Sequence, residues 1–97
     1  MIVRADLPRG IQSAQIIHAA GESSPGNLPE GTYAVSLTAR DEVHLSLIAK
    51  KLRLAGVEFT MIREPDAPYL GALMALGLHP KRKEEIRRHV SELPKLK

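Results

Sequence analysis

Residues 72–78 read Ala-Leu-Met-Ala-Leu-Gly-Leu and contain no polar side chain. Successive side chains of a strand point to opposite faces of a sheet, so a strand with this sequence must be covered on both faces. The chain has 97 residues, which is enough for one domain with one core and too few for two. We therefore expect a single α/β domain over residues 1–97, with this strand in the interior of its sheet and helices on both faces.

Strand and helix patterns alternate along the chain. Strands are expected over residues 2–7, 33–38, 57–64 and 72–78. Helices are expected over residues 11–21, from an N-cap at Asp41 to Gly56, and from Pro80 to Pro94. Strand-helix-strand units imply parallel strands with right-handed crossovers, and the short link before the last strand permits an antiparallel pair. The order strand-helix-strand-helix-strand-strand-helix thus predicts one mixed four-stranded sheet.

Apolar residues at helical spacing predict which side of each helix is buried. In the first helix these residues are Ala14, Ile17 and Ala20, widened by Ile16 and Ala19. In the second and third helices they are Leu45, Ile48, Leu52 and Ala55, and then Ile86, Val90 and Leu93. The first helix is apolar around most of its circumference, so we expect it to be well buried.

The composition excludes several kinds of chemistry. The chain has no Cys, which excludes disulfides, thiol catalysis and Cys-ligated zinc. No metal-ligand spacing joins the four His residues, which are His18, His44, His79 and His89. We therefore expect no metal and no cofactor. The longest apolar run is far shorter than the ~20 residues that cross a bilayer, and charges among the first six residues argue against a signal peptide. We expect a cytoplasmic protein with no membrane partner.

Positive charge is concentrated at the end of the chain. Residues 1–80 hold seven Lys and Arg against eight Asp and Glu, whereas residues 81–97 hold seven Lys and Arg against three Glu, a net charge of +4. This asymmetry indicates a nucleic acid or another anionic partner, with a solvated helix face as the alternative. The residues expected to contact RNA phosphates are Lys81, Arg82, Lys83, Arg87 and Arg88.

Polar side chains follow two of the expected strands. Asp6 ends the first strand, Glu64 ends the third, and Arg9 lies in the turn into the first helix. If these strands point the same way, both carboxylates emerge at one edge of the sheet, beside the free N–H groups of the helix. A carboxylate together with such donors is suited to orienting a water and stabilising an oxyanion. The alternative is that the carboxylates are capping groups or are simply solvated.

Five segments, in the right order, give the chain a family resemblance. They are Val-Arg-Ala-Asp-Leu at 3–7, Ala-Gln-Ile-Ile-His-Ala at 14–19, Ala-Arg-Asp-Glu at 39–42, the helix and strand of 45–64, and Leu-Gly-Leu-His-Pro at 76–80. Over nearly its whole length except residues 22–30, the chain resembles the type 2 peptidyl-tRNA hydrolases, the archaeal and eukaryotic kind. That family cleaves the ester between a peptide and the 3′ end of tRNA. The resemblance implies the same four-stranded mixed sheet with helices on both faces, no metal, and tRNA or peptidyl-tRNA as partner.

The resemblance also implies roles for particular residues. It places Glu64 at the reacting centre, where Glu64 and Asp6 would organise a water and Arg9 with the helix N–H groups would stabilise the oxyanion. The residues expected to bind the substrate are Gln15, His18, Asp66 and Tyr69. Tyr69 would stack on the terminal adenine. The alternatives are a core histidine at His18 and a tyrosine packed on its own loop prolines at Tyr69.

The chain departs from the family pattern at the site itself. Its first turn, Pro-Arg-Gly-Ile at 8–11, is about two residues shorter than the family's turn and lacks the lysine that is implicated in catalysis. Glu64 replaces an aspartate, and no threonine follows it. Arg9 differs from lysine in its planar, permanently charged head. A second hypothesis is therefore an inactive RNA- or protein-binding module on the same fold. A homodimer is left open.

Overall fold

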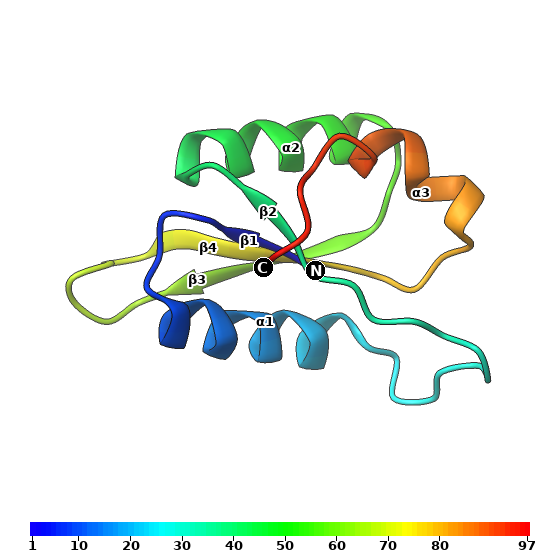
Figure 1. Cartoon of the computed structure of the whole chain (residues 1–97), viewed down its shortest axis with the longest axis horizontal. Coiled ribbons are helices and arrows are strands. Elements are labelled where there is room, and N and C mark those ends of the chain that lie inside the picture. Colours follow the sequence, from blue (N-terminus) through cyan, green and yellow to red (C-terminus); the bar gives the residue numbers. More distant parts are fainter.

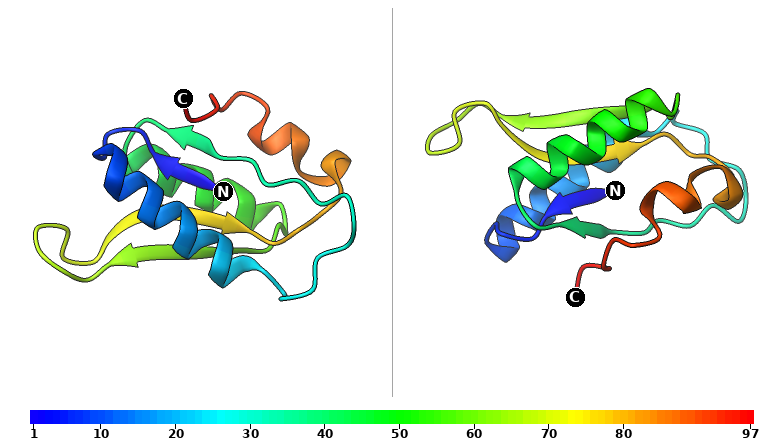
Figure 2. Two further views of the ribbon diagram at one scale, coloured as in Figure 1. Left: turned by 60° about the horizontal axis from the view of Figure 1, so that its bottom comes forward. Right: turned by 90° about the horizontal axis from the view of Figure 1, so that it is seen from above.

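The computed structural model describes residues 1–97 as one four-stranded sheet between helices (Figure 1). Its elements are β1 (Ile2–Arg4), α1 (Arg9–Ser23), β2 (Leu37–Ala39), α2 (Glu42–Leu54), β3 (Phe59–Glu64), β4 (Ala72–Leu78) and α3 (Lys83–Val90). Helix α1 covers one face of the sheet, and α2 and α3 lie on the other (Figures 1 and 2). The expected α/β class, mixed sheet and order of elements are confirmed.

The strands lie in the order β2-β1-β4-β3, so β4 is an interior strand as expected. Strand β1 is parallel to β2, and β4 is antiparallel to both β1 and β3. Strands β1, β2 and β3 therefore all point in one direction. Their carboxyl ends lie at the same end of the sheet, together with the first turns of α1 and α2 (Figure 1).

Strand β4 contributes to a separate core on each face of the sheet. Leu73 and Leu76 belong to the core under α2, whereas Met74 and Ala75 belong to the core under α1. Two neighbours share a face because the pairing of β3 with β4 shifts by one residue between Ile62 and Arg63. Such a bulge breaks the strict alternation of a strand. The expectation that both faces of this strand are covered is confirmed.

The close approach of α1 to β4 requires a glycine. A Cβ on Gly77 would collide with the carbonyl oxygen of Ala19 and lie 2.9 Å from the Cβ of Ser23. Ala19 and Ser23 are both buried on the inner face of α1. The glycine of the 72–78 segment therefore determines how closely the helix can pack on the sheet.

The predicted buried stripe of the first helix is wrong for Ala14 and Ile17 and confirmed for Ala19. Ala14 is exposed and Ile17 is 71% exposed, whereas the inner face carries Gln12, Gln15, Ala19 and Ser23. Gln12 is buried because its Nε2 donates to the carbonyl oxygens of Arg4 and Ala5 at 3.0 and 3.3 Å. Hydrogen bonds that two glutamines make at the sheet end thus set the rotation of the helix. Gly21 does not end it, since α1 continues to Ser23.

Strands β1 and β2 are shorter than predicted. Strand β1 ends at Arg4 rather than at residue 7, and β2 comprises only Leu37–Ala39. Strand β2 pairs with β1 alone among the strands, and β1 offers three partners, so residues 33–36 have no strand to continue along. Tyr33 is consequently 88% exposed.

The second helix follows its prediction closely, and the third does so in part. The Asp41 side chain caps α2 by accepting a hydrogen bond from the His44 N–H at 2.9 Å, and Leu45, Ile48 and Leu52 are buried. Ala55 is the C-cap residue and is exposed. Helix α3 begins at Lys83 rather than at Pro80, and none of its residues is fully buried. No helix of the structure has the length and apolar character needed to cross a membrane.

Candidate functional site

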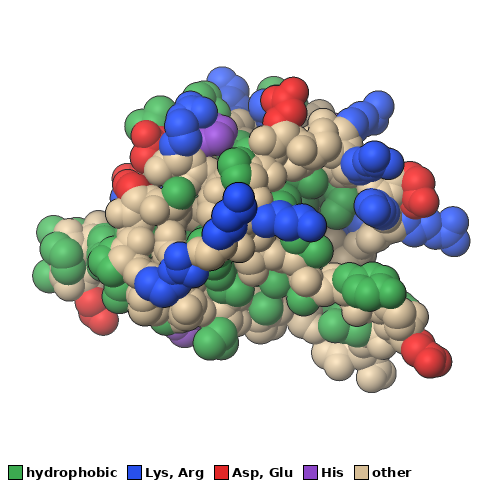
Figure 3. Space-filling model, in the orientation of Figure 1, with side chains coloured by type: hydrophobic (Ala, Val, Ile, Leu, Met, Phe, Trp, Pro, Cys, Tyr) green, Lys and Arg blue, Asp and Glu red, His purple; other side chains and the backbone are tan.

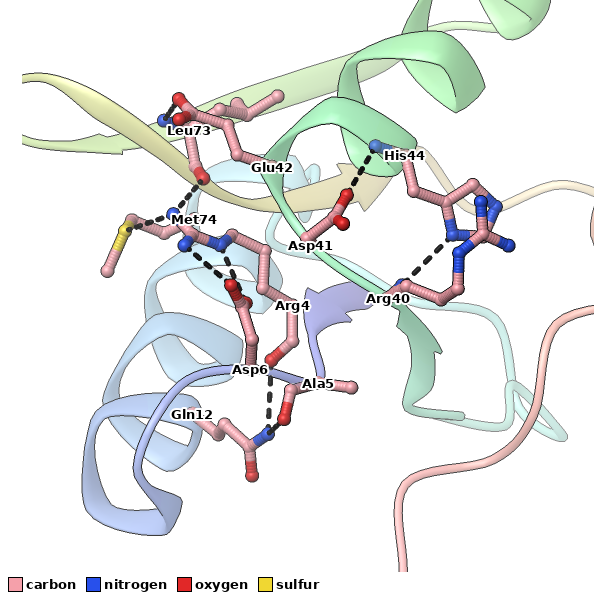
Figure 4. Close-up of polar contacts among 10 residues, drawn as sticks. All are labelled: Arg4, Ala5, Asp6, Gln12, Arg40, Asp41, Glu42, His44, Leu73 and Met74. Atoms are coloured by element: carbon pink, nitrogen blue, oxygen red, sulfur yellow. Dashed lines mark hydrogen bonds and ion pairs between the residues drawn. The ribbon is translucent and has the colours of Figure 1, made fainter.

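Side chains from four elements meet at the end of the sheet where β1, β2 and β3 finish. They come from β1 and the segment after it, the inner face of α1, the first turn of α2, and the end of β3. Figure 4 shows the first three of these groups. Because β1 and β3 point the same way, Asp6 and Glu64 both emerge at this end, as the sequence predicted. The two carboxylates nevertheless have different partners.

Asp6 is bound by Arg4, two residues before it. Arg4 Nε lies 2.9 Å from Asp6 Oδ1 and Arg4 Nη2 lies 3.0 Å from Asp6 Oδ2, so both carboxylate oxygens accept from one guanidinium (Figure 4). This hydrogen bonding lowers the pKa of the Asp6 carboxyl and raises the pKa of Arg4. Bidentate pairs of this kind are strong and directional. Asp6 is therefore a partner of Arg4 rather than an unengaged carboxylate.

Arg4 and Glu42 together hold the backbone of β4 at Leu73. Arg4 Nη1 donates to the Leu73 carbonyl oxygen at 3.2 Å, and Glu42 Oε2 accepts from the Leu73 N–H at 2.8 Å (Figure 4). Glu42 belongs to the first turn of α2, so these contacts connect that helix to β1 and β4. The sequence alone did not assign Glu42 to the site. Because Glu42 follows the N-cap residue, its presence there was already explained by the start of a helix. Nothing in the sequence indicated a partner in β4.

Glu64 is the carboxylate that neutral donors hold. Its Oε2 accepts from Gln15 Nε2 at 3.3 Å, and its Oε1 accepts from the Asp66 backbone N–H at 3.3 Å. Both distances are long for hydrogen bonds, and Glu64 is half-buried. The side chain is thus oriented by these two donors and has no cation paired to it.

Gln15 is an amide buried against Glu64. It is only 3% exposed, and its Oε1 accepts no hydrogen bond from any protein group. A buried polar atom without a partner is costly, and a catalytic role is one of the explanations for such an atom in a native structure. The N–H group of Gln15 donates to Glu64 and thereby fixes the orientation of that carboxylate. The structure thus brings Gln15 and Glu64 together, as expected.

The other expected site residues do not all lie beside this pair. His18 is exposed on α1, which contradicts the alternative of a core histidine. Asp66 is exposed, whereas Tyr69 is half-buried and packs against the core under α1. Arg9 is exposed and makes no ion pair with either carboxylate. It instead lines an open groove with residues 94–97 at the end of the chain.

The expected RNA-binding residues of the last helix are at the other end of the molecule. Lys81, Arg82, Lys83, Arg87 and Arg88 are all exposed, and α3 follows the end of β4 opposite to Glu64 (Figure 1). Six residues of β3 separate the two ends, which corresponds to about 20 Å of strand. Of these five residues, only Lys81 makes an ion pair, in which its Nζ lies 3.7 Å from Glu58 Oε1. A ligand that contacts both regions must therefore be long.

The structure contains no group of three or more His, Asp or Glu side chains arranged to hold a metal ion. Comparison with models of known protein families finds none that matches the chain, and comparison with curated proteins finds no matching relative. Inference about function therefore depends on the geometry of the site and on the short motifs in the sequence.

Proposed function

We propose that this protein hydrolyses the ester bond of peptidyl-tRNA, releasing the peptide and the tRNA. The observation that carries the proposal is the arrangement of Glu64, a carboxylate held at the sheet end by the Gln15 amide and the Asp66 N–H. The order of the elements and the five motifs that resemble type 2 peptidyl-tRNA hydrolases support the same assignment.

In this mechanism Glu64 orients the attacking water, accepts its proton and returns that proton to the 3′ oxygen of the tRNA when the ester C–O bond breaks. The carboxylate has no paired cation to neutralise it, so it remains available as a base. Gln15 Nε2 donates to Glu64 Oε2 and so holds the carboxylate in the orientation in which it directs that water toward the ester carbonyl carbon. Asp6 contributes indirectly, because its pairing with Arg4 stabilises the backbone around the site.

The direct test is hydrolysis of an N-acetylated aminoacyl-tRNA by the purified protein. Glu64→Gln removes the proton acceptor at equal size, so we expect kcat to fall by about 10²–10⁴, the usual contribution of general acid–base catalysis. Glu22→Gln is the matched control, since Glu22 is an exposed residue of the same helix as Gln15. Activity of Glu64→Gln equal to that of the control would contradict the assignment of Glu64.

A binding module without catalytic activity is the second candidate. The observation that favours it is the engagement of both Asp6 oxygens by Arg4, which leaves Glu64 as the one candidate base among the expected catalytic residues. If the wild-type protein binds tRNA and shows no hydrolysis above background, this candidate replaces the first.

A further inference from the structure

The last residues of the chain dock on the outer edge of β2. The Thr38 N–H donates to the Pro94 carbonyl oxygen at 2.8 Å, and the Leu96 N–H donates to the Ser36 carbonyl oxygen at 2.9 Å. Lys95 forms an antiparallel bridge with Leu37 between these two bonds. The segment is therefore held in an extended conformation rather than projecting freely into solvent.

This docking determines where the lysines of the segment point. Alternate residues of an extended segment point to opposite sides. Leu96 packs against the core under α1, so Lys95 and Lys97 lie on the other side of the segment, and both are exposed. The docked backbone thus fixes the positions from which two cations extend.

Arg9 joins these two lysines in a single groove. The groove is lined by Arg9, Lys95 and Lys97 together with Gln12, Thr38 and four apolar residues, and no acidic side chain takes part. None of the three cations makes an ion pair. Figure 3 shows blue side chains across the middle of this face, with red ones around its outline. We call this feature the C-terminal basic groove.

We propose that the C-terminal basic groove binds the phosphodiester backbone of RNA. The proposal rests on the proposed function, because it assigns the path that the tRNA substrate follows on the protein. Phosphate groups match a concave site with three unpaired cations and no acidic side chain. The side chains of Leu7 and Leu96 in its lining pack into the core, so neither is available to insert into a lipid surface.

The position of the groove relates it to the two regions that the substrate must reach. Residues 94–97 are separated from α3 by residues 91–93, and Arg9 is the first residue of α1, at the end of the sheet where Glu64 lies (Figure 1). The groove lies at the β2 edge and Glu64 ends β3 at the opposite edge, so an RNA backbone that leaves the groove at Arg9 must cross the end of the sheet to reach the carboxylate. Arg9 therefore binds a phosphate in this assignment, rather than stabilising the oxyanion as expected from the sequence.

The experiment measures the affinity for deacylated tRNA over a series of salt concentrations. Lys95→Ala/Lys97→Ala removes both charges and keeps Leu96 and the backbone bonds, while Lys50→Ala/Lys51→Ala removes two exposed charges of α2 as the control. Each lost phosphate contact lowers the slope of log affinity against log salt by about 0.7–0.9. We expect the slope of the groove variant to be less steep than that of the wild type by about 1.4–1.8, and the slope of the control to equal that of the wild type.

Two further measurements separate the possible outcomes. In the hydrolysis assay we expect the groove variant to have a higher KM and an unchanged kcat. If the wild-type protein proves inactive, the salt slope alone tests whether the groove binds RNA. Equal slopes for the groove and control variants would overturn the proposal. Binding of the wild-type protein to vesicles containing anionic lipid, lost in the groove variant while tRNA binding is retained, would also overturn it and assign the groove to a membrane surface.

Discussion

The two carboxylates at the sheet end have different roles because they have different hydrogen-bond partners. Asp6 accepts from a guanidinium with both oxygens, whereas Glu64 accepts from an amide and a backbone N–H. A paired cation neutralises the first carboxylate and makes it part of the framework. Neutral donors orient the second and leave its charge available for chemistry.

The Asp6–Arg4 pair should make stability depend on pH. The pKa of Asp6 is lowered in the folded state, so its contribution is present above its unfolded pKa of about 3.9 and is lost as the pH falls through the folded value. We expect Asp6→Asn to be less stable than wild type at pH 7 by about 1 kcal/mol or less, as for other exposed pairs. The difference should shrink below pH ~4.

Urea unfolding of both proteins at pH 7, 4 and 3 measures this dependence. Asp66→Asn serves as the control, because Asp66 is exposed and its carboxylate has no ion pair. A stability difference for Asp6→Asn that stays constant down to pH 3 would show that the pair is not the cause.

At this scale the sequence indicated which residues meet but not how they are bonded. Strand direction alone predicted that Asp6 and Glu64 lie at the same end of the sheet. The resembling motif placed Gln15 in the site. The hydrogen bonds that Arg4 and Glu42 make with β4 could not be predicted. Both are made to the backbone of Leu73, which is 69 residues from Arg4 and 31 residues from Glu42 along the chain.

Among the elements, α1 owes its position to polar and small residues rather than to its apolar stripe. Gln12 and Gln15 turn inward to bond groups at the sheet end, and Ala19 faces Gly77. Periodicity counts apolar residues and treats a buried glutamine as exposed, so it located the helix and put Ala19 on its inner face but wrongly placed Ala14 and Ile17 there. Helix α2 makes one such polar contact, from Glu42 to the Leu73 N–H, and its inner face is otherwise apolar. The predicted stripe holds there except at Ala55, which is exposed.

Gly77→Ala tests the close contact between α1 and β4. The added methyl group would meet the Ala19 carbonyl and the Ser23 side chain, so helix and strand must separate. We expect a loss of about 1–3 kcal/mol in the free energy of unfolding, the usual range for overpacking. Urea denaturation measures the loss.

Gly21→Ala is the matched control for this prediction. Gly21 lies in α1, and a Cβ there would have no atom within 4 Å. Replacing a glycine inside a helix by alanine stabilises it by about 0.4–1 kcal/mol. If both variants shift stability in the same direction, the proposed contact does not limit the packing.

Over the whole molecule, charge and candidate chemistry lie at opposite ends of the sheet. The length of β3, about 20 Å, separates the cations of α3 from Glu64, which is beyond the reach of any side chain (Figure 1). The sequence showed that the basic residues cluster near the end of the chain, and this could be read without a structure. It did not show that residues 94–97 turn back to the sheet beside Arg9, because that contact joins two ends of the chain.

This separation predicts that α3 affects binding and not chemistry. Arg82→Ala/Lys83→Ala should weaken tRNA binding and lower the salt slope by about 1.4–1.8, while kcat for peptidyl-tRNA stays unchanged. Lys81 is left in place because its ammonium group is already paired with Glu58. Titrations of tRNA at several salt concentrations test this, with Lys50→Ala/Lys51→Ala as the charge-matched control. An unchanged slope would assign these charges to solubility.

The docked end of the chain also makes the two edges of the sheet unlike each other. Residues 94–96 bond to the outer side of β2, whereas the outer side of β3 is free along Phe59–Glu64. A free strand edge can pair with another copy, and a sheet with two free edges can extend without limit. Here strand pairing between copies would stop at two molecules, because each would present its closed edge outward. The segment 94–96 thus leaves only a very short strand at this edge, and its removal would open the outer side of β2 to pairing with another copy.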